Sequence, residues 1–450
     1  MKRKLSSEKT RLFLYFFFIA LLGSILLSLP QAYKNGIPVN YIDALFTSVS
    51  AICVTGLSTL SMDVFSRTGL IFILILIEAG GLGILTYISF LMTVSSKKIS
   101  VVNGNLIKDF YIDDIEFNPK SILKKIVLFT LLIQVIGSIL LIPGLYKAGD
   151  QHFIFNSIFL SISAFCNAGF SPSSDSLSGF SGNWYVLSII MGLIILGGIG
   201  FVVFTNIAQK IRFARKGQIF YLSLHVKIVL ISTVVLIVSG FVFTFISFYK
   251  TSLWELPLSK RILTALFESV TLRTAGFETI PQTSFTSSAS LFHLVLMFIG
   301  GSPGSIAGGV KTTTAFITLL YLLDGNEQRT TVSFANRRIP STIINKSITI
   351  VSRSVLILLI SAISLSYVEN HLISNGTISL IDIIYESVSA LATVGLSRGL
   401  TPQLSTLGKL IIIITMYIGR TGIYAMSIKS GFTGSDNEDL IYPEESLLVG

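Results

Sequence analysis

A short apolar segment that runs into a glycine occurs four times in this chain of 450 residues. The copies read YIDALFTSVSAICVTGL (41–57), FNSIFLSISAFCNAGF (155–170), LTALFESVTLRTAGF (263–277) and IDIIYESVSALATVGL (381–396). Their glycines are separated by 113, 107 and 119 residues and are Gly56, Gly169, Gly276 and Gly395. A near-constant period of this kind indicates an internal repeat.

Each copy is apolar enough for a membrane but shorter than the roughly 20 residues that a crossing needs. We therefore predict four half-length helices that enter the membrane and end at a glycine strand. A glycine adopts left-handed backbone at little cost, so successive carbonyl oxygens can face a common axis. Four such strands would form a ring of oxygens that replaces the water shell of a monovalent cation. The alternative, four core helices with ordinary glycine caps, explains one copy better than four.

The composition indicates a polytopic membrane protein. Hydrophobic residues make up 51% of the chain and charged residues 12%, with a mean hydropathy of +0.77, whereas soluble domains carry about 25% charged residues. Of the 33 Lys and Arg, 21 fall in the two ends and alternate loops and 8 in the facing loops, which predicts cytoplasmic termini. No basic soluble domain suggests nucleic acid, and two cysteines with four scattered histidines suggest neither a disulfide framework nor a His/Cys metal site.

The fold prediction is an all-α membrane protein with eight spans and four re-entrant segments in a pseudo-fourfold arrangement around one pore. The predicted spans are residues 12–29, 70–94, 122–142, 184–207, 226–248, a broken span from about 289 to 323, 348–368 and 407–428. The four units are residues 1–97, 98–211 with a cytoplasmic connector, 212–330, and 331–450 with a cytoplasmic tail. An even number of crossings per unit makes the repeats parallel, unlike the inverted repeats of many transporters.

The third unit interrupts its second span with MFIGGSPGSIAGGVKTTT, from Met297 to Thr314. Five glycines and a proline do not sustain a regular helix, so we predict a loop at membrane depth that acts as a gate. Arg420 lies within the last span and is a functional candidate, because an arginine in the membrane interior is costly. We expect Arg420 to contact the loop at 300–314 and hold it, with Lys311 at the inner mouth.

Two further charged residues lie in predicted membrane segments. Arg273 precedes the third glycine strand and would repel cations if it faced the axis, so we expect it behind the strand, paired with Glu268 or Glu386. A plain charge at the helix end is an equal alternative. Glu78 precedes GGLG in the second span and either attracts cations or is protonated and buried; the sequence leaves this open.

These motifs carry a family resemblance. The strands CVTGL, CNAGF, RTAGF and TVGL, the loop GGSPGSIAGGVKTT and the late IGRTG resemble the Trk/Ktr/HKT superfamily of potassium transporters over nearly the whole chain. Within it, the sequence is most similar to the KtrB-type membrane subunit. The resemblance implies selective K+ uptake across the plasma membrane, which Na+ often stimulates in the Ktr branch. We expect K+ as the transported ion and no organic cofactor on this chain. It also implies a homodimer with one pore per subunit and a cytoplasmic KtrA-type RCK ring that binds ATP or ADP.

The resemblance also assigns site residues. The selectivity filter would comprise Val54, Thr55, Gly56, Asn167, Ala168, Gly169, Thr274, Ala275, Gly276, Thr393, Val394 and Gly395. The gate would comprise Gly300, Gly301, Gly304, Ser305, Gly308, Gly309, Lys311 and Arg420. Each strand keeps one glycine where the potassium-channel filter TVGYG has two, which predicts fewer ion sites and looser discrimination against Na+.

The sequence thus predicts a K+ translocating subunit without a catalytic site. One alternative is a Na+ transporter on the same scaffold, although a glycine rather than a serine in the first strand favours K+ among relatives. The other is a membrane enzyme or scaffold without a pore, which would show clustered His, Asp and Glu at helical spacing. The sequence contains no such cluster and no nucleotide-hydrolysis motif.

Overall fold

The computed structural model describes residues 2–34, 39–94, 119–249, 251–324, 332–335 and 337–421, and side chains from residue 13 onward except 83–94 and 119–123. Its helices are α1 (Lys2–Leu27), α2 (Tyr41–Ile52), α3 (Arg67–Val94), α5 (Pro119–Lys147), α6 (Phe153–Phe165), α7 (Trp184–Ile199), α8 (Phe201–Arg215), α9 (Leu224–Ser247), α10 (Leu258–Thr271), α11 (Ser287–Phe298), α12 (Thr312–Leu323), α13 (Ser341–Val368), α14 (Asn370–Ser374), α15 (Leu380–Ala392) and α16 (Thr406–Thr421). One antiparallel hairpin pairs β1 (Val332–Phe334) with β2 (Arg337–Ile339). The predicted tail after residue 432 and most of the connector predicted over 97–125 lie outside the described residues.

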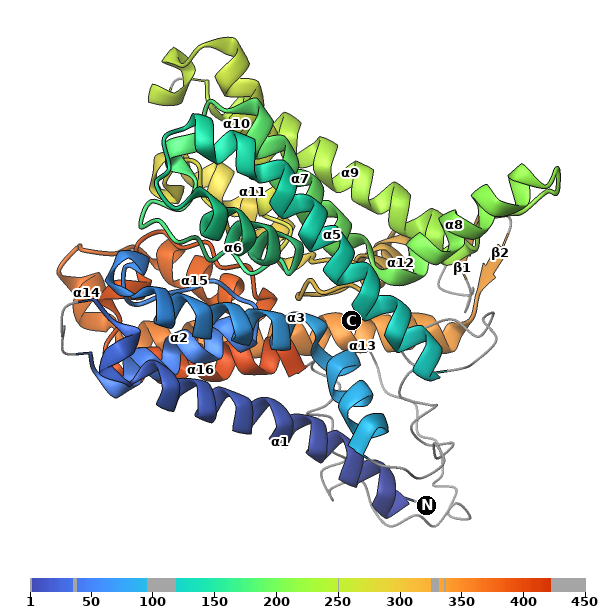
Figure 1. Ribbon diagram of the computed structural model, residues 1–450, viewed down its shortest axis with the longest axis horizontal. Helices are drawn as coiled ribbons and strands as arrows, with labels where there is room; N and C mark the ends of the chain where they lie inside the picture. The colour runs from blue at the N-terminus through green and yellow to red at the C-terminus, as the bar shows by residue number, and fades with distance from the viewer. Residues whose placement is uncertain are drawn as a thin grey trace, which may run out of the picture.

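The helices follow a repeated order of long, short and long. The short helices α2, α6, α10 and α15 each pack against the long helix before them, respectively α1, α5, α9 and α13. The helix after each short one is α3, α7, α11 or α16. Figure 1 shows α2 and α16 side by side, and the two are in contact, so the last unit returns to the first. The mostly helical architecture is confirmed.

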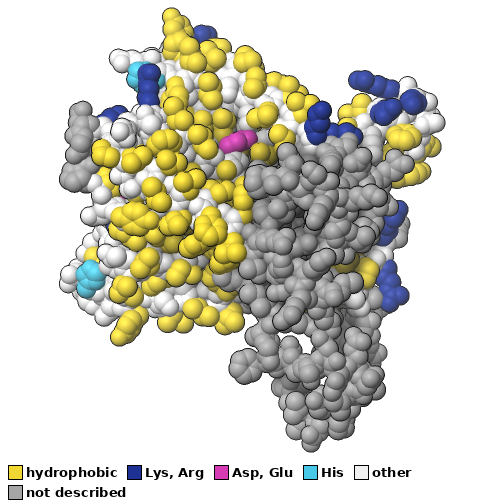
Figure 2. Space-filling view, turned by 60° about the horizontal axis from the view of Figure 1, so that its bottom comes forward, with side chains coloured by type: hydrophobic (Ala, Val, Ile, Leu, Met, Phe, Trp, Pro, Cys, Tyr) yellow, Lys and Arg dark blue, Asp and Glu magenta, His cyan; other side chains and the backbone are white. Residues whose placement is uncertain are grey.

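Three helical segments in the described residues are long and apolar enough to cross a membrane, Lys124–Lys147, Leu224–Ser247 and Ser341–Val368. A fourth candidate is the bent pair α7 and α8. The lipid-facing character is clear on α5, where Leu128 and Ile139 are 64% and 60% exposed. Figure 2 shows hydrophobic side chains over the described part of one face, with Lys and Arg at its borders. The predicted total of eight spans stays a prediction.

The second helix of the second unit differs from its prediction. We expected an unbroken span over 184–207, but α7 ends at Ile199 and α8 departs at 95°. The break lies at Gly200, whose φ of +94° suits glycine alone. The carbonyl of Gly304 accepts a hydrogen bond from the Phe201 amide at 3.2 Å, so the third unit's loop contacts the chain at this turn. The prediction of a continuous helix through GGIG is therefore wrong.

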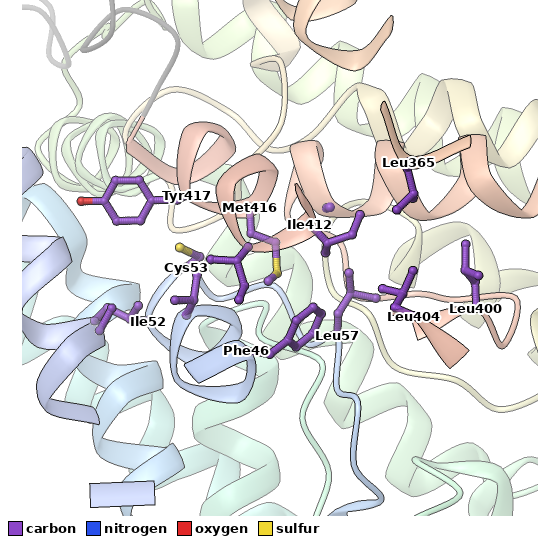
Figure 3. Close-up of a cluster of buried hydrophobic side chains, with 14 of the residues drawn as sticks. Phe46, Ile52, Cys53, Leu57, Leu365, Leu400, Leu404, Ile412, Met416 and Tyr417 are labelled. Carbon is purple, nitrogen blue, oxygen red and sulfur yellow. The ribbon is translucent and has the colours of Figure 1, made fainter. Parts of the chain in front are cut away.

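Buried side chains join the units in a closed order. Figure 3 shows the cluster between the first and fourth units, where Phe46 and Leu57 pack with Ile412 and Met416. Three further clusters join the other neighbours: Val54 with Phe170 for the first and second units, Leu193 with Phe267 for the second and third, and Met297 with Tyr385 for the third and fourth. Each seam thus contains an apolar cluster, and the four short helices are fixed around one centre.

Candidate functional site: four glycine strands and a loop

The four glycine strands share one backbone pattern. Each begins with a left-handed residue that is not glycine, and its glycine two positions later also has a positive φ. The first residues and their φ values are Val54 (56°), Asn167 (56°), Thr274 (64°) and Thr393 (51°). The glycines are Gly56 (95°), Gly169 (71°), Gly276 (76°) and Gly395 (98°). Left-handed backbone costs a non-glycine residue about 1–2 kcal/mol, so four such residues at equivalent positions indicate a functional constraint.

The strands meet in a ring. A Cβ atom built on each glycine would approach a carbonyl oxygen of the next strand: Ala168 for Gly56 (2.4 Å), Ala275 for Gly169 (2.9 Å), Val394 for Gly276 (2.2 Å) and Thr55 for Gly395 (2.1 Å). The order first, second, third, fourth and back to first closes the ring. Such contacts leave no room for a side chain. Glycine is therefore required at all four positions for this reason as well as for its positive φ. The structure therefore brings together all twelve residues of the predicted strands.

Hydroxyl groups on the short helices support the strands. Ser50 and Ser389 Oγ each accept a hydrogen bond, at 3.1 Å, from the amide of their own strand's glycine, Gly56 and Gly395. In the other two units, Ser163 donates to the Phe170 carbonyl at 2.7 Å and Thr271 to the Phe277 carbonyl at 2.8 Å. The sequence interpretation missed these residues. The sequence does mark them: the four copies contain SVS, SIS, SVT and SVS, and in each the last residue carries the supporting hydroxyl.

A glycine on the following helix lets the end of each short helix pack closely in three units. A Cβ on Gly80 or Gly197 would lie 1.9 Å from the carbonyl oxygen of Ile52 or Phe165. A Cβ on Gly419 would lie 2.0 Å from the Leu391 carbonyl oxygen. This close approach explains the glycines in GGLG, GGIG and IGRTG. In the third unit the helix ends instead at Phe298.

The glycine-rich loop, residues 299–311 between α11 and α12, is held by backbone hydrogen bonds. Gly300 donates to Val310 at 3.0 Å and Val310 donates to Phe298 at 3.1 Å, which closes the loop on itself. The Ser302 amide donates to Gly198 at 2.9 Å, which ties the loop to the end of α7. The loop also faces the glycine strands, because a Cβ on Gly308 would lie 2.0 Å from Thr393 Oγ1. The predicted break of this span is therefore present.

Arg420 makes the contact predicted from the sequence. Its NH1 donates to the carbonyl of Ile306 in the loop at 2.6 Å, and its NH2 donates to the carbonyl of Gly80 on α3. The guanidinium thus bridges the loop to the first unit from a helix of the fourth. Lys311 donates to the Ala307 carbonyl, so its ammonium group is held within the loop rather than free in a pore. The gating role of these residues stays a prediction.

The predicted ion pair of Arg273 is wrong for the part of the chain that is described. There, Nε and NH2 of Arg273 and both carboxylate oxygens of Glu268 are buried without a hydrogen-bond partner. Glu386 accepts instead from Ser397 at 2.8 Å and from Thr401. Arg273 lies beyond the end of α10 at Thr271, in the turn that leads into the third strand, whereas Glu268 lies within the helix.

Glu78 is linked to the second unit. Its Oε2 accepts from Gln134 Nε2 at 2.8 Å, and Cys166 Sγ lies 3.6 Å away. Cys166 directly precedes the second glycine strand. Glu78 therefore lies behind that strand, at the seam between the first two units.

Comparison with known proteins agrees with this geometry. Residues 16–435 match the family model TrkH, described as cation transport protein. The chain is 34% identical over 442 residues to the potassium/sodium uptake protein NtpJ of Enterococcus hirae, covering 97% of this chain and 95% of the relative. It is 32% identical over 439 residues to the Ktr system potassium uptake protein B of Bacillus subtilis, with the same coverage of 97% and 95%.

A solved structure shows the same fold. The crystal structure of the potassium transporter TrkH from Vibrio parahaemolyticus superposes with a TM-score of 0.72 at 18% identity, covering 94% of this chain and 85% of that chain. The family match and the full-length relatives are independent of that superposition. Together they show that the chain belongs to the TrkH family of cation transport proteins, so it is a multi-pass membrane transporter and not an enzyme.

Proposed function

We propose that this protein takes up K+ through a pore whose narrowest, selective part is the ring of four glycine strands. The observation that carries the proposal is the closed order of contacts in which each glycine lies against a carbonyl of the next strand. Backbone carbonyls arranged in this way replace the hydration shell of an alkali cation. Full-length relatives whose names specify potassium uptake support K+ as the transported ion.

The short helices contribute to the same task. α2, α6, α10 and α15 each end directly before a glycine strand, so their C-terminal ends point toward the ring. The C-terminal end of a helix carries a partial negative charge of about half an elementary charge, which favours a cation. Four such ends around one centre lower the electrostatic energy of an ion that has lost its water.

The glycine-rich loop and Arg420 form the gate in this proposal. The loop lies between α11 and α12 and against Thr393 of the fourth strand, and Arg420 fixes it through the Ile306 carbonyl. Movement of the loop would open the path without disturbing the glycine strands. We further propose, from the family resemblance and the charge distribution, cytoplasmic termini, a homodimer, a nucleotide-binding KtrA-type ring as the regulator, and Na+ as a stimulating ion.

Complementation tests the function. The chain is expressed in a bacterium that lacks its own K+ uptake systems, and growth and Rb+ uptake are measured at limiting K+. We expect rescue by the parent chain and loss of rescue by Gly276→Ser, because a Cβ there would lie 2.2 Å from a carbonyl oxygen. The matched control is Gly149→Ser, which has a similar φ of +82° but open space around it, so its uptake should equal that of the parent.

The same assay separates the alternatives. Uptake of Na+ equal to that of K+ would indicate a Na+ transporter on this scaffold and would contradict the K+ assignment. Absence of any ion uptake by a well-expressed parent chain, with Gly276→Ser unchanged from it, would favour a membrane protein without a pore.

A further inference from the structure

Arg398 lies at the outer end of the fourth glycine strand, three residues after Gly395. Its Nε lies 2.6 Å from Oδ1 of Asp382, a residue in the first turn of α15. The two side chains are only 13% and 15% exposed. A mostly buried cation beside the proposed cation path needs an explanation, because it would repel the ions that the ring is proposed to accept.

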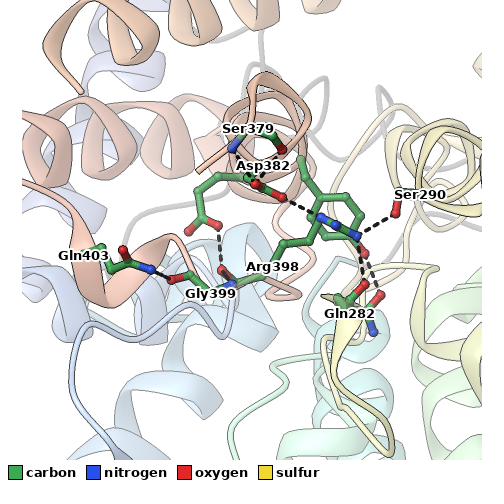
Figure 4. Close-up of polar contacts among 10 residues, drawn as sticks. Gln282, Ser290, Ser379, Asp382, Arg398, Gly399 and Gln403 are labelled. Atoms are coloured by element: carbon green, nitrogen blue, oxygen red, sulfur yellow. Dashed lines mark hydrogen bonds and ion pairs between the residues drawn. The ribbon is translucent and has the colours of Figure 1, made fainter. Parts of the chain in front are cut away.

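The guanidinium also crosses the seam between the third and fourth units. Its NH1 donates to the Gln282 carbonyl at 2.9 Å and to Ser290 Oγ at 2.8 Å. Gln282 lies six residues beyond Gly276, and its Oε1 accepts from Tyr385 of α15 at 2.8 Å. Figure 4 shows Arg398 reaching from its own loop toward Asp382 on one side and toward Gln282 and Ser290 on the other. The fourth strand is thereby tied to the segment that follows the third strand.

Asp382 is itself held in place. Its Oδ2 accepts from both the amide and the hydroxyl of Ser379, at 2.8 and 2.6 Å, which forms the cap of α15. Its Oδ1 receives the guanidinium. With both oxygens engaged, the carboxylate keeps a fixed position and its charge stays beside that of Arg398.

The other units show which part of this arrangement is particular to the fourth. In the first unit, Asp43 is also the third residue of its short helix, and Thr59 lies three residues after the glycine. Thr59 donates to Asp43 Oδ1 at 2.7 Å, and Lys409 of α16 lies 2.6 Å from the same oxygen. In the third unit the corresponding residue is Thr279, whose buried hydroxyl has no hydrogen-bond partner in the described residues. Among the four glycine strands, only the fourth is thus followed at this position by a cationic residue, Arg398.

We infer that Arg398 is a positioning and specificity-determining residue, and that Asp382 cancels its charge at the outer mouth. Arg398 fixes the spacing between the third and fourth strands, on which selection of K+ over Na+ depends. Asp382 neutralises the guanidinium of Arg398, so a cation can pass this residue at the mouth. This inference rests on the proposed function of the ring.

The two roles give the two residues opposite effects on apparent affinity. Loss of Asp382 leaves an unpaired positive charge at the mouth and weakens cation entry. Loss of Arg398 leaves a negative charge that strengthens entry but frees the strand, so selectivity falls. An unpaired unit charge beside the path of an ion changes the ion's local concentration by roughly tenfold before screening. Since salt screens exposed charges, we expect changes of about three- to tenfold.

The test measures K+ uptake kinetics and inhibition by Na+ in the uptake-deficient bacterium, at equal amounts of protein in the membrane. Asp382→Asn should raise the KM for K+ about three- to tenfold with selectivity retained. Arg398→Gln should leave the KM unchanged or lower it, and Na+ should inhibit or enter several times more effectively. The double variant should return the KM toward the parent value. Raising ionic strength should shrink the KM effects but not the loss of selectivity.

Two further variants keep the inference falsifiable. Arg398→Lys retains the charge but not the fork of donors, so its KM should match the parent while selectivity falls partway. Gln403→Ala removes a bond to the Gly399 carbonyl within the same loop, at 2.8 Å, and should change neither quantity. If Asp382→Asn and Arg398→Gln shift the KM in the same direction by similar factors, or if Arg398→Gln keeps full selectivity, the inference is overturned. K+ uptake by the parent chain decides the proposed function separately.

Discussion

The glycine strands and the helices that follow them differ in how strictly the four units agree. Around the ring, every strand has the same pair of left-handed residues, the same contact with its neighbour and a hydroxyl that supports it. In the following helices, α3 is continuous over 28 residues, α7 bends into α8 at Gly200, and α11 gives way to a loop. A ring that coordinates one ion needs equivalent walls, whereas a gate needs one element unlike the others.

The third unit carries most of the asymmetry. Its loop bonds to the second unit through Gly198, to the fourth through Arg420 and lies against Thr393. The break in one unit thus involves residues of two others. Under the proposed function, selection is distributed over four similar parts, while control is concentrated in one.

The largest effect should come from the glycines of the ring, and it should follow their spacing. Gly395→Ala places a Cβ 2.1 Å from a carbonyl oxygen, whereas Gly169→Ala places it 2.9 Å away, the loosest of the four contacts. Strained backbone costs about 1–3 kcal/mol per residue, and the clash adds to this. We expect K+ uptake to fall about a hundredfold for Gly395→Ala and about tenfold for Gly169→Ala. Equal loss at both positions would show that φ, not spacing, sets the tolerance.

The next largest effect should come from Arg420. Arg420→Ala removes two charge-assisted hydrogen bonds, each worth about 1.5–3 kcal/mol, to the loop and to α3. The freed loop should make uptake several times faster at saturating K+ without a change in selectivity. Arg420→Lys retains the charge and one donor group, so its uptake rate should lie between those of the parent and Arg420→Ala. Unchanged uptake by Arg420→Ala at normal expression would remove the loop's link to gating.

The next effect should appear in thermal stability, at the contact between α3 and the end of α2. Gly80→Ala places a Cβ 1.9 Å from the Ile52 carbonyl oxygen, whereas Gly192→Ala on α7 meets nothing within 4 Å. Overpacking costs about 1–3 kcal/mol, so only the first variant should lower the melting temperature in detergent. A melting temperature for Gly80→Ala that matches Gly192→Ala would mean that α3 and α2 can separate freely.

The smallest effect should come from the hydroxyls behind the strands. Ser50→Ala and Ser389→Ala each remove one hydrogen bond to a glycine amide; such a bond contributes about 0.5–1.5 kcal/mol net, and somewhat more where the amide stays unsatisfied. Both variants should raise Na+ inhibition of K+ uptake by about two- to threefold, because the strand loses one support. Ser28→Ala, on an exposed hydroxyl that bonds within its own turn, serves as the control and should behave as the parent.

The glycine positions could be predicted because the same short segment ending in glycine occurs four times, and such a repeat can be recognised in a single sequence. The left-handed conformations of Val54 and Thr274 could not, because β-branched residues disfavour that region and only the surrounding packing imposes it. The bend at Gly200 was missed since GGIG and GGLG look alike; the contact with Gly304 that distinguishes them is more than 100 residues away. The partner of Arg273 was predicted wrongly because charge alone does not show which way a side chain beyond the end of α10 points.

The most direct test of the central claim is to locate the ion. Anomalous diffraction from crystals grown in Rb+ measures where a K+ analogue binds within the protein. We predict peaks on the axis of the ring, coordinated by carbonyl oxygens of all four glycine strands, including those of Thr55, Ala168, Ala275 and Val394. Rb+ density that lies elsewhere, or that contacts side chains rather than these carbonyls, would contradict the account.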